Sequence, residues 1–343
     1  MTAAVHEGLD LLALQRFLTD SGVSIDGELR AELISGGKSN LTYGILDNSS
    51  HWVLRRPPTA GLTPSAHDVA REYRITSALQ DSGVPVARTV ALCEDTSVMG
   101  APFTVVEHVD GRVVRSKDDL DLLTDNEIES CTAELVRVIA ALHNVDYVAA
   151  GLGEFGRPDG YVTRQVKLWA SQWERVKTRE LPDLERLHAA LADSIPESPT
   201  PSIVHGDYRI DNVILDASDA GKVAAVVDWE LSTLGDPLTD LALMCVYRHP
   251  ALDQVLGFPA AWTSARLPSA DELVQRYAVA SGREIAHWNF YMGLAHFKLA
   301  VIAEGINHRW QVGATVGDGF DQAGASVPAL VASGLAALKG AES

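Results

Sequence analysis

The chain has 343 residues, which is long for one small core and fits two domains or lobes. Its apolar content of 46% is ordinary for a globular enzyme, and its formal net charge of −18 argues against a general nucleic-acid-binding protein, because a phosphate backbone requires a basic face. Cys93, Cys131 and Cys245 are widely spaced, which excludes a zinc ribbon and disfavours a disulfide framework.

The N-terminal stretch MTAAVHEGLDLLALQRFLTD has neither the basic start nor the long apolar run of a signal peptide. No apolar run approaches the length of a membrane span. We therefore expect a cytoplasmic protein that binds neither membranes nor nucleic acid and that exists as a monomer or a homodimer.

Helical spacing opens the chain and strand spacing follows it. Residues Leu9 to Thr19 carry leucines and Phe17 at helical intervals, with Gly22 as the stop signal. Residues Leu29 to Pro57 change to strand-like spacing, broken by GGKSN and by DNSS. This pattern predicts a helix followed by a three-stranded antiparallel meander.

The first break in the meander has two interpretations. Gly36 and Gly37 would let backbone N–H groups approach phosphate oxygens closely, with Ser39 and Asn40 in the same loop. The alternative is an ordinary hairpin turn. The loop is not a Walker A motif, because Glu32 stands where that motif has a glycine and a strand, not a helix, follows the serine.

The strand from Trp52 to Pro57 carries a cation two residues after a small apolar side chain. Val53 and Arg55 share one face of the strand, opposite to Trp52 and Leu54. Arg55 is therefore either a ligand-facing cation or an exposed basic strand end.

The next segments predict a helix, an extended stretch and a strand. The helix from Ser65 to Asp81 begins with a Ser-x-x-Asp pattern and contains Glu72, which by itself reads as a solvated acid. An extended segment begins at Val84, and Pro102 to Val106 reads as a buried strand that leads into residues 107–111. We place the lobe boundary near residue 110.

The rest of the chain is dominated by helical patterns. Thr124 and Glu127 form a capping box for a helix that ends at His143, which reads as a satisfied helix-end histidine. Trp169 and Trp173 lie four residues apart on a later helix, as a core pair or as part of an acceptor pocket. The other expected helices are Tyr161–Arg179, Pro182–Ser194, one capped by Ser269 and Glu272, Ile285–His308, and an Ala-rich one in the tail from Val316.

The most informative stretch is SIVHGDYRIDNVILDASDAGKVAAVVDWE, which begins at Ser202. It predicts a hairpin of two short strands with its functional side chains at the strand ends: Asp207, then Asn212 five residues later, then Asp228. Phosphoryl transfer needs a group that aligns the attacking hydroxyl and oxygen ligands for Mg²⁺. These three side chains supply such groups.

Each of these residues has a simpler interpretation when taken alone. A single Asp at a strand end is usually a turn cap. Four polar positions at fixed offsets within one hairpin favour a functional site instead. His205 stays open between a structural hydrogen-bonding residue that fixes the loop and an acid or base.

The pattern His-x-Asp-x4-Asn, followed by a strand that ends in Asp, resembles the catalytic loop and metal aspartate of the protein-kinase-like superfamily. The form HGD…N…VVDWE is similar to its aminoglycoside phosphotransferase and choline kinase branch. This resemblance implies an α+β, two-lobed fold. Residues 1–106 would form a small antiparallel-sheet lobe that binds the nucleotide, 107–111 the hinge, and 112–343 a larger, mainly helical lobe for catalysis and acceptor binding.

The resemblance also implies roles for individual residues, with ATP and Mg as cofactors. Asp207 would orient the hydroxyl, and Asn212 and Asp228 would bind the metal. Arg55, paired with Glu72, would position the phosphates, although the superfamily usually has lysine there. The remaining nucleotide-binding positions would be Gly36, Gly37, Ser39, Asn40, Val53, the carbonyl of Glu107 and the amide of Val109. Asp236 and Asp240, in the segment GDPLTDLA, would be scaffolding.

The segments VLRRPP, PSAHDVAREYRI, RQVKLWASQWERVKT and FYMGLAHFKLAVIAEGI look like phosphotransferases found as domains or neighbours of acyl-CoA dehydrogenases. That likeness implies a small-molecule hydroxyl acceptor such as a hydroxyacid or hydroxyacyl-CoA, and a functional association with an acyl-CoA dehydrogenase. Two alternatives stay open. One is an aminoglycoside O-phosphotransferase, and the other is a nucleotide-binding pseudokinase that acts through protein contacts.

Overall fold

The computed structural model describes residues 7–35, 40–58, 68–197, 200–314 and 319–340. The chain forms two compact units. The first comprises Met1–Asp110 together with Ala224–Ser232, and the second comprises Gly111–Val223 together with Thr233–Ser343. The sequence analysis had assigned residues 224–232 to the C-terminal lobe, whereas this segment belongs to the first unit.

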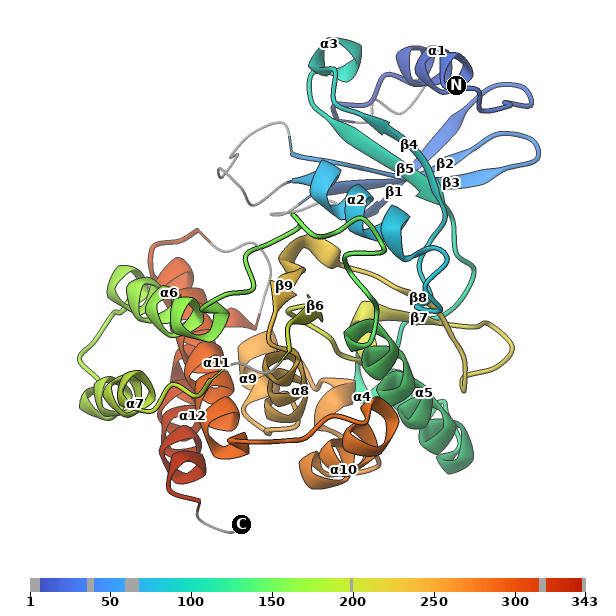
Figure 1. Cartoon of the computed structure of the whole chain (residues 1–343). Coiled ribbons are helices and arrows are strands. Elements are labelled where there is room, and N and C mark those ends of the chain that lie inside the picture. The colour runs from blue at the N-terminus through green and yellow to red at the C-terminus, as the bar shows by residue number, and fades with distance from the viewer. Residues whose placement is uncertain (1–6, 36–39, 59–67, 198–199, 315–318, 341–343) are drawn as a thin grey trace. The chain divides into compact units, whose positions relative to one another are not determined.

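The first unit is built on a five-stranded antiparallel sheet with the strand order β1-β2-β3-β5-β4 (Figure 1). The strands are β1 Arg30–Ser35, β2 Leu41–Leu46, β3 His51–Arg56, β4 Thr89–Cys93 and β5 Phe103–Glu107. The first three form the predicted meander. Strand β3 is paired on both sides, and its Val53 lies opposite Gly44 of β2 and Val106 of β5.

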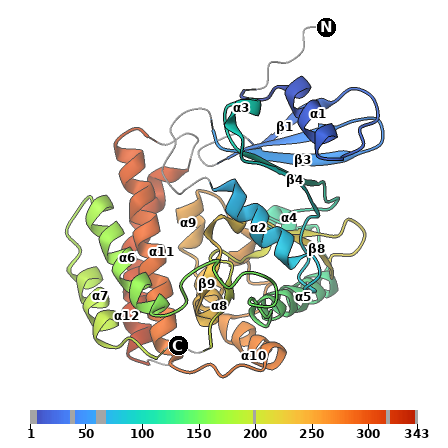
Figure 2. The ribbon, with the colours of Figure 1, turned by 45° about the horizontal axis from the view of Figure 1, so that its top comes forward.

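The two faces of this sheet are covered differently (Figures 1 and 2). Helix α1, Leu11–Asp20, begins at an Asp10 cap and buries Leu14 and Leu18 against Tyr43 and Leu54. Helix α2, Val69–Leu79, lies on the opposite face, the one that carries Val53 and Arg55. The short helix α3, Thr96–Met99, has no counterpart in the sequence prediction.

One predicted boundary in this unit is wrong. Helix α2 begins at Val69 and is capped by Asp68, whose side chain accepts the N–H of Arg71, while the proposed start at Ser65 lies outside the described residues. The predicted extended segment at Val84 precedes strand β4, which begins at Thr89. Pro85 has no N–H to donate to a ladder, and its carbonyl accepts instead from Val226.

The second unit is mainly helical. Its helices are α4 Lys117–Asp121, α5 Asp125–His143, α6 Tyr161–Val176, α7 Pro182–Asp193, α8 Pro237–Val246, α9 Leu252–Leu256, α10 Ala270–Ser281, α11 Trp288–Gln311 and α12 Ala323–Leu338. The predicted capping boxes at Thr124 and Ser269 are both present, which fixes the starts of α5 and α10. Helix α11 begins at Trp288 rather than at the predicted Ile285, because His287 before it has a left-handed backbone conformation.

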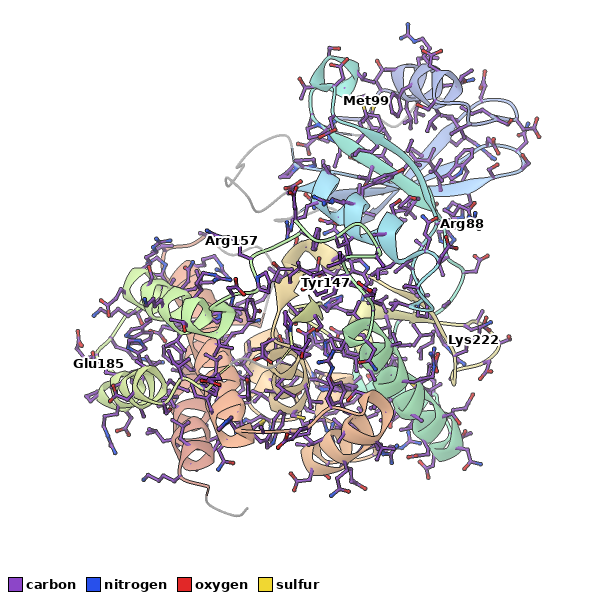
Figure 3. All side chains as sticks on the ribbon, viewed as in Figure 1. Arg88, Met99, Tyr147, Arg157, Glu185 and Lys222 are labelled. Carbon is purple, nitrogen blue, oxygen red and sulfur yellow. The ribbon has the colours of Figure 1, made fainter. Side chains whose placement is uncertain are left out.

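The longest helix, α11, packs along α12 and also contacts α6 and α7, and α7 contacts α12 as well (Figures 1 and 2). On α7 the buried side chains are Leu184, Leu187 and Leu191, whereas Glu185 points outward (Figure 3). None of the helices described in ranges 7–35, 40–58, 68–197, 200–314 and 319–340 is long and apolar enough to cross a bilayer.

The short strands of the chain hold the predicted catalytic residues. Strand β6, Ser202–Val204, pairs antiparallel with β9, Thr233–Gly235. Strand β7, Val213–Leu215, leads to a turn in which the N–H of Asp216 donates a hydrogen bond to the carbonyl of Lys222. The side chain of Lys222 points outward (Figure 3). Strand β8, Val223–Val226, then leads towards Asp228. The remaining 3₁₀ turns are η1 Ile210–Asn212, η2 Trp229–Leu231, η3 Ala261–Thr263 and η4 Phe320–Gln322.

Candidate active site

In the first unit, one arginine contacts three carboxylates. Arg55 Nη1 lies 3.1 Å from Glu72 Oε2, the pairing that the family resemblance implied. Its Nη2 lies 3.5 Å from Asp228 Oδ1 and 3.6 Å from Glu230 Oε2. The neighbouring Arg56 is buried and donates to the backbone carbonyls of Gly8, Pro57 and Met99, so it is structural.

The position of Glu72 follows from helix α2, which directs it toward the sheet. Its carboxylate is almost fully buried and also accepts a 3.3 Å hydrogen bond from Asn40 Nδ2. Burial raises the pKa of Glu72 to about 7; Arg55 opposes this shift, and Asp228 and Glu230 add to it. Glu72 therefore lies in a cluster that holds more carboxylates than cations.

Asp228 has a backbone conformation that is unusual for a residue other than glycine, with φ 66° and ψ 57°. Such a left-handed residue costs roughly 1–2 kcal/mol and is tolerated best by Asn and Asp. The turn is fixed by Trp229 Nε1, which donates to the Val226 carbonyl, and by Arg71 Nη2, which donates to the Ser232 carbonyl. The turn thus holds the carboxylate of Asp228 beside Arg55.

Several polar atoms of this cluster are buried without a hydrogen-bond partner among the residues that the structure describes. They are Asn40 Oδ1 and Arg55 Nε; Asp228 Oδ1 likewise accepts no hydrogen bond, although it lies 3.5 Å from Arg55 Nη2. Buried polar atoms are normally satisfied, so unpaired ones in a single cluster mark a place for a polar ligand. The cluster suits a nucleotide phosphate beside Arg55 and a cation beside Asp228.

The remaining nucleotide-binding predictions have mixed outcomes. Val53 is half-buried on the same face as Arg55. The Glu107 amide donates to the Arg88 carbonyl and the His108 amide to the His51 carbonyl; neither bond uses the Glu107 carbonyl or the Val109 amide, whose contact with adenine stays a prediction. Gly36, Gly37 and Ser39 lie outside the described residues.

In the second unit, Asp207 is held by several donors. Its Oδ1 accepts from Tyr247 Oη at 2.5 Å and lies 3.5 Å from Arg209 Nε. Its Oδ2 accepts from Asn212 Nδ2 at 3.1 Å. The carboxylate therefore has a fixed orientation, which a proton acceptor needs.

Asn212 follows Asp207 through the 3₁₀ turn η1, which brings the two side chains together. Its Nδ2 also donates to the Asp207 carbonyl at 2.7 Å. Both hydrogen bonds of the Asn212 side chain use the amide nitrogen, so the amide oxygen is the atom that can serve as a ligand. This orientation fits the predicted metal-binding role.

A buried network behind the loop clarifies the role of the histidines. His205 is fully buried, and its Nδ1 accepts the backbone N–H of Asp207 at 3.2 Å. Asp240 accepts the backbone N–H groups of His205 and Gly206 at 2.5 Å and 2.8 Å. His143 lies 3.3 Å from Asp240. These contacts favour the structural interpretation of His205, and they show Asp240 and His143 as scaffolding.

The predicted scaffolding role of Asp236 also agrees with its contacts. Its side chain caps helix α8 by accepting the N–H of Leu238 at 3.0 Å, and its other oxygen accepts from Tyr291 Oη at 2.6 Å.

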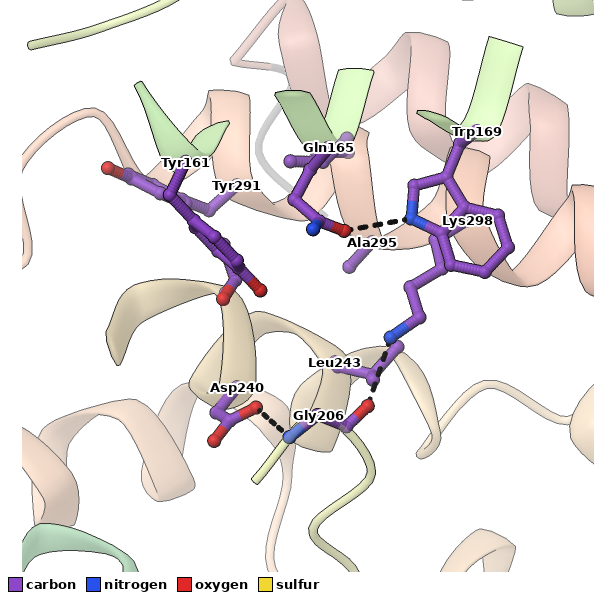
Figure 4. Close-up of a pocket in the computed structure, with 11 residues that line it drawn as sticks. Tyr161, Gln165, Trp169, Gly206, Asp240, Leu243, Tyr291, Ala295 and Lys298 are labelled. Carbon is purple, nitrogen blue, oxygen red and sulfur yellow. Dashed lines mark hydrogen bonds between the residues drawn. The ribbon is translucent and has the colours of Figure 1, made fainter. Parts of the chain in front are cut away.

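A pocket opens beside the catalytic loop within the second unit (Figure 4). Its walls come from α6, α8 and α11 and from Gly206, and they include Gln165, Trp169, Leu243 and Lys298. The predicted tryptophan pair is therefore divided. Trp173 is buried in the core, whereas Trp169 is half-buried and lines the pocket.

Sequence reasoning missed three residues that contact the predicted ones. Glu230 stands two positions after Asp228, and both carboxylates contact Arg55. The sequence VVDWE could therefore have indicated Glu230 as a second acidic residue of this cluster. Tyr247, at the end of α8, contacts Asp207, and Lys298, on α11, contacts Gly206. Both are far from the catalytic loop in the sequence, so no spacing pattern predicts these contacts.

The predicted residues therefore form two groups. Asn40, Arg55, Glu72 and Asp228 come together in the first unit, and Asp207 and Asn212 come together in the second. Among the residues that the structure describes, no three His, Cys, Asp or Glu side chains form a metal site on their own. Mg²⁺ usually takes only one or two carboxylates and completes its shell with water and phosphates, so this finding is compatible with the proposed ligands.

Comparison with known proteins agrees with this geometry. Residues 30–282 match the family model of the phosphotransferase enzyme family, APH. A crystal structure from Ralstonia eutropha, provisionally described as an aminoglycoside phosphotransferase, is 34% identical with a TM-score of 0.85 and covers 97% of this chain and 99% of its own.

Two curated relatives are longer proteins. Acyl-CoA dehydrogenase family member 10 of Mus musculus is 36% identical over 302 residues, which are 87% of this chain and 28% of that protein. Acyl-CoA dehydrogenase family member 11 of Homo sapiens is 33% identical over 306 residues, 88% of this chain and 39% of that protein. The chain spans less than half of their length. The match to the family model covers most of the chain, which therefore belongs to the phosphotransferase enzyme family and has a protein-kinase-like fold.

Proposed function

We propose that the chain is an ATP- and Mg-dependent phosphotransferase that moves the γ-phosphate to a hydroxyl of a small molecule, such as a hydroxyacid or hydroxyacyl-CoA. The observation that carries this proposal is the fixed carboxylate of Asp207, which Tyr247 and Asn212 hold by hydrogen bonds. Asp207 accepts the hydrogen bond of the acceptor hydroxyl and aligns its oxygen for attack. The proton of that hydroxyl passes to the carboxylate as the new O–P bond forms.

The nucleotide is held by residues of the first unit. Arg55 binds the phosphates, and Glu72 holds the guanidinium in place by the 3.1 Å ion pair. Val53 packs against the adenine, whose edge bonds to the Glu107 carbonyl and the Val109 amide. Gly36, Gly37, Ser39 and Asn40 cover the phosphates. Complexes with ADP in the phosphotransferase APH(4)-Ia, which is 16% identical, support a nucleotide as the donor.

Asn212 and Asp228 are the proposed metal ligands, because both offer oxygen atoms that suit Mg²⁺. When bound, Mg²⁺ supplies positive charge that stabilises the negative charge on the phosphate oxygens. Arg55 alone cannot neutralise Glu72, Asp228 and Glu230, so the cluster has an excess of negative charge that favours a cation.

The class of acceptor is supported by the relatives named acyl-CoA dehydrogenase family members, in which this chain's counterpart is one part of a longer protein. We propose an acyl compound with a hydroxyl group as acceptor, and a functional association with an acyl-CoA dehydrogenase. An aminoglycoside is the second candidate, favoured by the description of the Ralstonia eutropha structure and by a 28% identical viomycin phosphotransferase.

An acceptor-dependent ADP-release screen tests the proposal. The panel contains hydroxyacids, hydroxyacyl-CoAs, aminoglycosides, choline and sugars, with ATP and Mg²⁺, and calorimetry measures ATP binding with and without Mg²⁺. We expect ATP binding that requires Mg²⁺ and ADP release that depends on a hydroxyacid or a hydroxyacyl-CoA. ATP binding with no ADP release for any acceptor would favour a pseudokinase, and release with aminoglycosides alone would favour the second candidate.

A further inference from the structure

The pocket beside the catalytic loop contains a lysine whose charge is not paired. Lys298 extends from α11 and donates a 3.0 Å hydrogen bond to the carbonyl of Gly206, the residue before Asp207 (Figure 4). Its ammonium group also lies 5.4 Å from the ring centroid of Trp169. Both partners are neutral, and no ion pair between Lys298 and a carboxylate occurs among the described residues.

The nearby carboxylates are already supplied with donors. Asp240 accepts two backbone N–H groups and lies beside His143, and Asp207 accepts from Tyr247 and Asn212. Lys298 is half-buried, and burial lowers its pKa, while the charges of Asp207 and Asp240 act in the opposite direction. A partly desolvated ammonium without a contacting anion is costly unless a ligand completes its shell.

The other walls of the pocket are mainly aromatic or aliphatic. Trp169 presents its indole, and Leu243, Leu294 and Ala295 are apolar. The Trp169 Nε1 donates to the amide oxygen of Gln165 at 3.2 Å, so the amide nitrogen of Gln165 is the end that can donate to a ligand (Figure 4). The pocket therefore combines an aromatic and aliphatic wall with two donors, one of them cationic.

We propose that Lys298 binds the carboxylate of the acceptor, and that the preferred acceptors are therefore small hydroxycarboxylates. This inference rests on the proposed function. The carboxylate pairs with the ammonium of Lys298 and accepts from the Gln165 amide, the carbon chain lies along Trp169, and the hydroxyl is directed toward Asp207. A polycationic aminoglycoside would instead bring ammonium groups toward Lys298, which like-charge repulsion disfavours.

The test compares matched acceptors that differ only in charge. The probes are hydroxycarboxylates with the hydroxyl on the second to the sixth carbon, each paired with its own primary amide. The proteins are the wild type, Lys298→Met, Lys298→Arg and the control Lys167→Met, which removes an exposed lysine from the same helix as Trp169. Binding is measured by calorimetry and turnover by ADP release.

For the wild type we expect carboxylates to bind more tightly than their amides by about 10-fold to 100-fold, the usual effect of one charged hydrogen bond. Lys298→Met should remove this preference by raising the KM and Kd of the carboxylates while changing those of the amides by less than about threefold. Lys298→Arg should retain part of the preference, and Lys167→Met all of it.

Three results overturn the inference: no carboxylate binds the wild type, carboxylates and amides bind equally, or Lys298→Met weakens both classes by the same factor. The last result would assign Lys298 to the support of the Gly206 carbonyl alone. The proposed function fails separately, if no acceptor of any charge stimulates ADP release. Calorimetry still decides the role of Lys298 in that case, because carboxylate binding does not require turnover.

Discussion

The hydroxyl of Tyr247 donates a 2.5 Å hydrogen bond to Oδ1 of Asp207. Tyr247 is buried at the end of α8, and the guanidinium of Arg209 lies 5.3 Å from the centroid of its ring. Burial raises the pKa of Tyr247 well above its usual value, and the charge of Asp207 adds to this shift, so the hydroxyl stays a donor. This contact orients the proposed base from a residue 40 positions further along the chain.

Replacing Tyr247 by Phe removes this donor and preserves the ring. We expect kcat to fall by roughly 10-fold to 100-fold, since a hydrogen bond to a charged group is worth about 1.5–3 kcal/mol, with little change in the KM for ATP. Steady-state kinetics measures both values. The matched control is Tyr208→Phe, which removes the bond from a neighbouring tyrosine to the Leu135 carbonyl and should lower stability more than kcat. Equal kinetic losses in the two variants would remove the specific role of Tyr247.

Asp207→Asn tests the proposed base directly. The amide keeps the size of the side chain but cannot take a proton, so kcat should fall by about 10² to 10⁴ while ATP binding stays nearly intact. Kinetics and calorimetry on the same preparation separate the two effects. Asp211→Asn serves as control, because this carboxylate is 3.2 Å from Arg209 and has no assigned part in the reaction. Turnover that is unchanged in Asp207→Asn would exclude the residue as base.

Asp228→Asn should affect nucleotide binding in opposite directions with and without metal. With Mg²⁺ the affinity for ATP should fall by at least about tenfold, because a carboxylate ligand is lost. Without Mg²⁺ the affinity should rise or stay the same, since the change removes one of three negative charges around Arg55. Calorimetry with Mg²⁺ or with a chelator measures both. Loss of affinity under both conditions would indicate a structural role for Asp228 instead.

The part of the site that the sequence predicts well is the part that local motifs encode. The separation of Asp207 and Asn212 is set by one 3₁₀ turn, and their hydrogen bond follows from that spacing. The Arg55–Glu72 ion pair was implied only by the family resemblance, because the residues alone favoured a solvated Glu72. Strand-like spacing predicted the meander, and the capping boxes predicted the starts of α5 and α10.

The part that the sequence does not predict depends on packing between distant elements. Tyr247 directly follows the apolar helix α8 and Lys298 lies within α11, and nothing in either local sequence indicates which distant residues these side chains contact. Trp169 and Trp173 share helical spacing, yet only Trp173 is in the core, whereas Trp169 lines the pocket.

Acid should destabilise the protein through a histidine outside the active site. His296 on α11 is buried, its Nδ1 bonds to the Met292 carbonyl at 2.8 Å, and its ring lies 5.9 Å from that of His249. Burial lowers the pKa of His296 from 6.5 to about 4, and His249 acts in the same direction. Because the folded pKa lies below the unfolded one, protonation favours unfolding. The contribution of His296 is complete above about pH 6.5 and is lost as the pH falls toward 4.

The full loss corresponds to roughly 3 kcal/mol of unfolding free energy. Urea unfolding at pH values between 4 and 7 should show this slope in the wild type, and His296→Gln should reduce it. His296→Phe provides the second variant, because it changes packing differently but also cannot take a proton, so both variants should lose the same pH dependence whatever their absolute stabilities. A slope that survives in both would place the acid sensitivity in other groups.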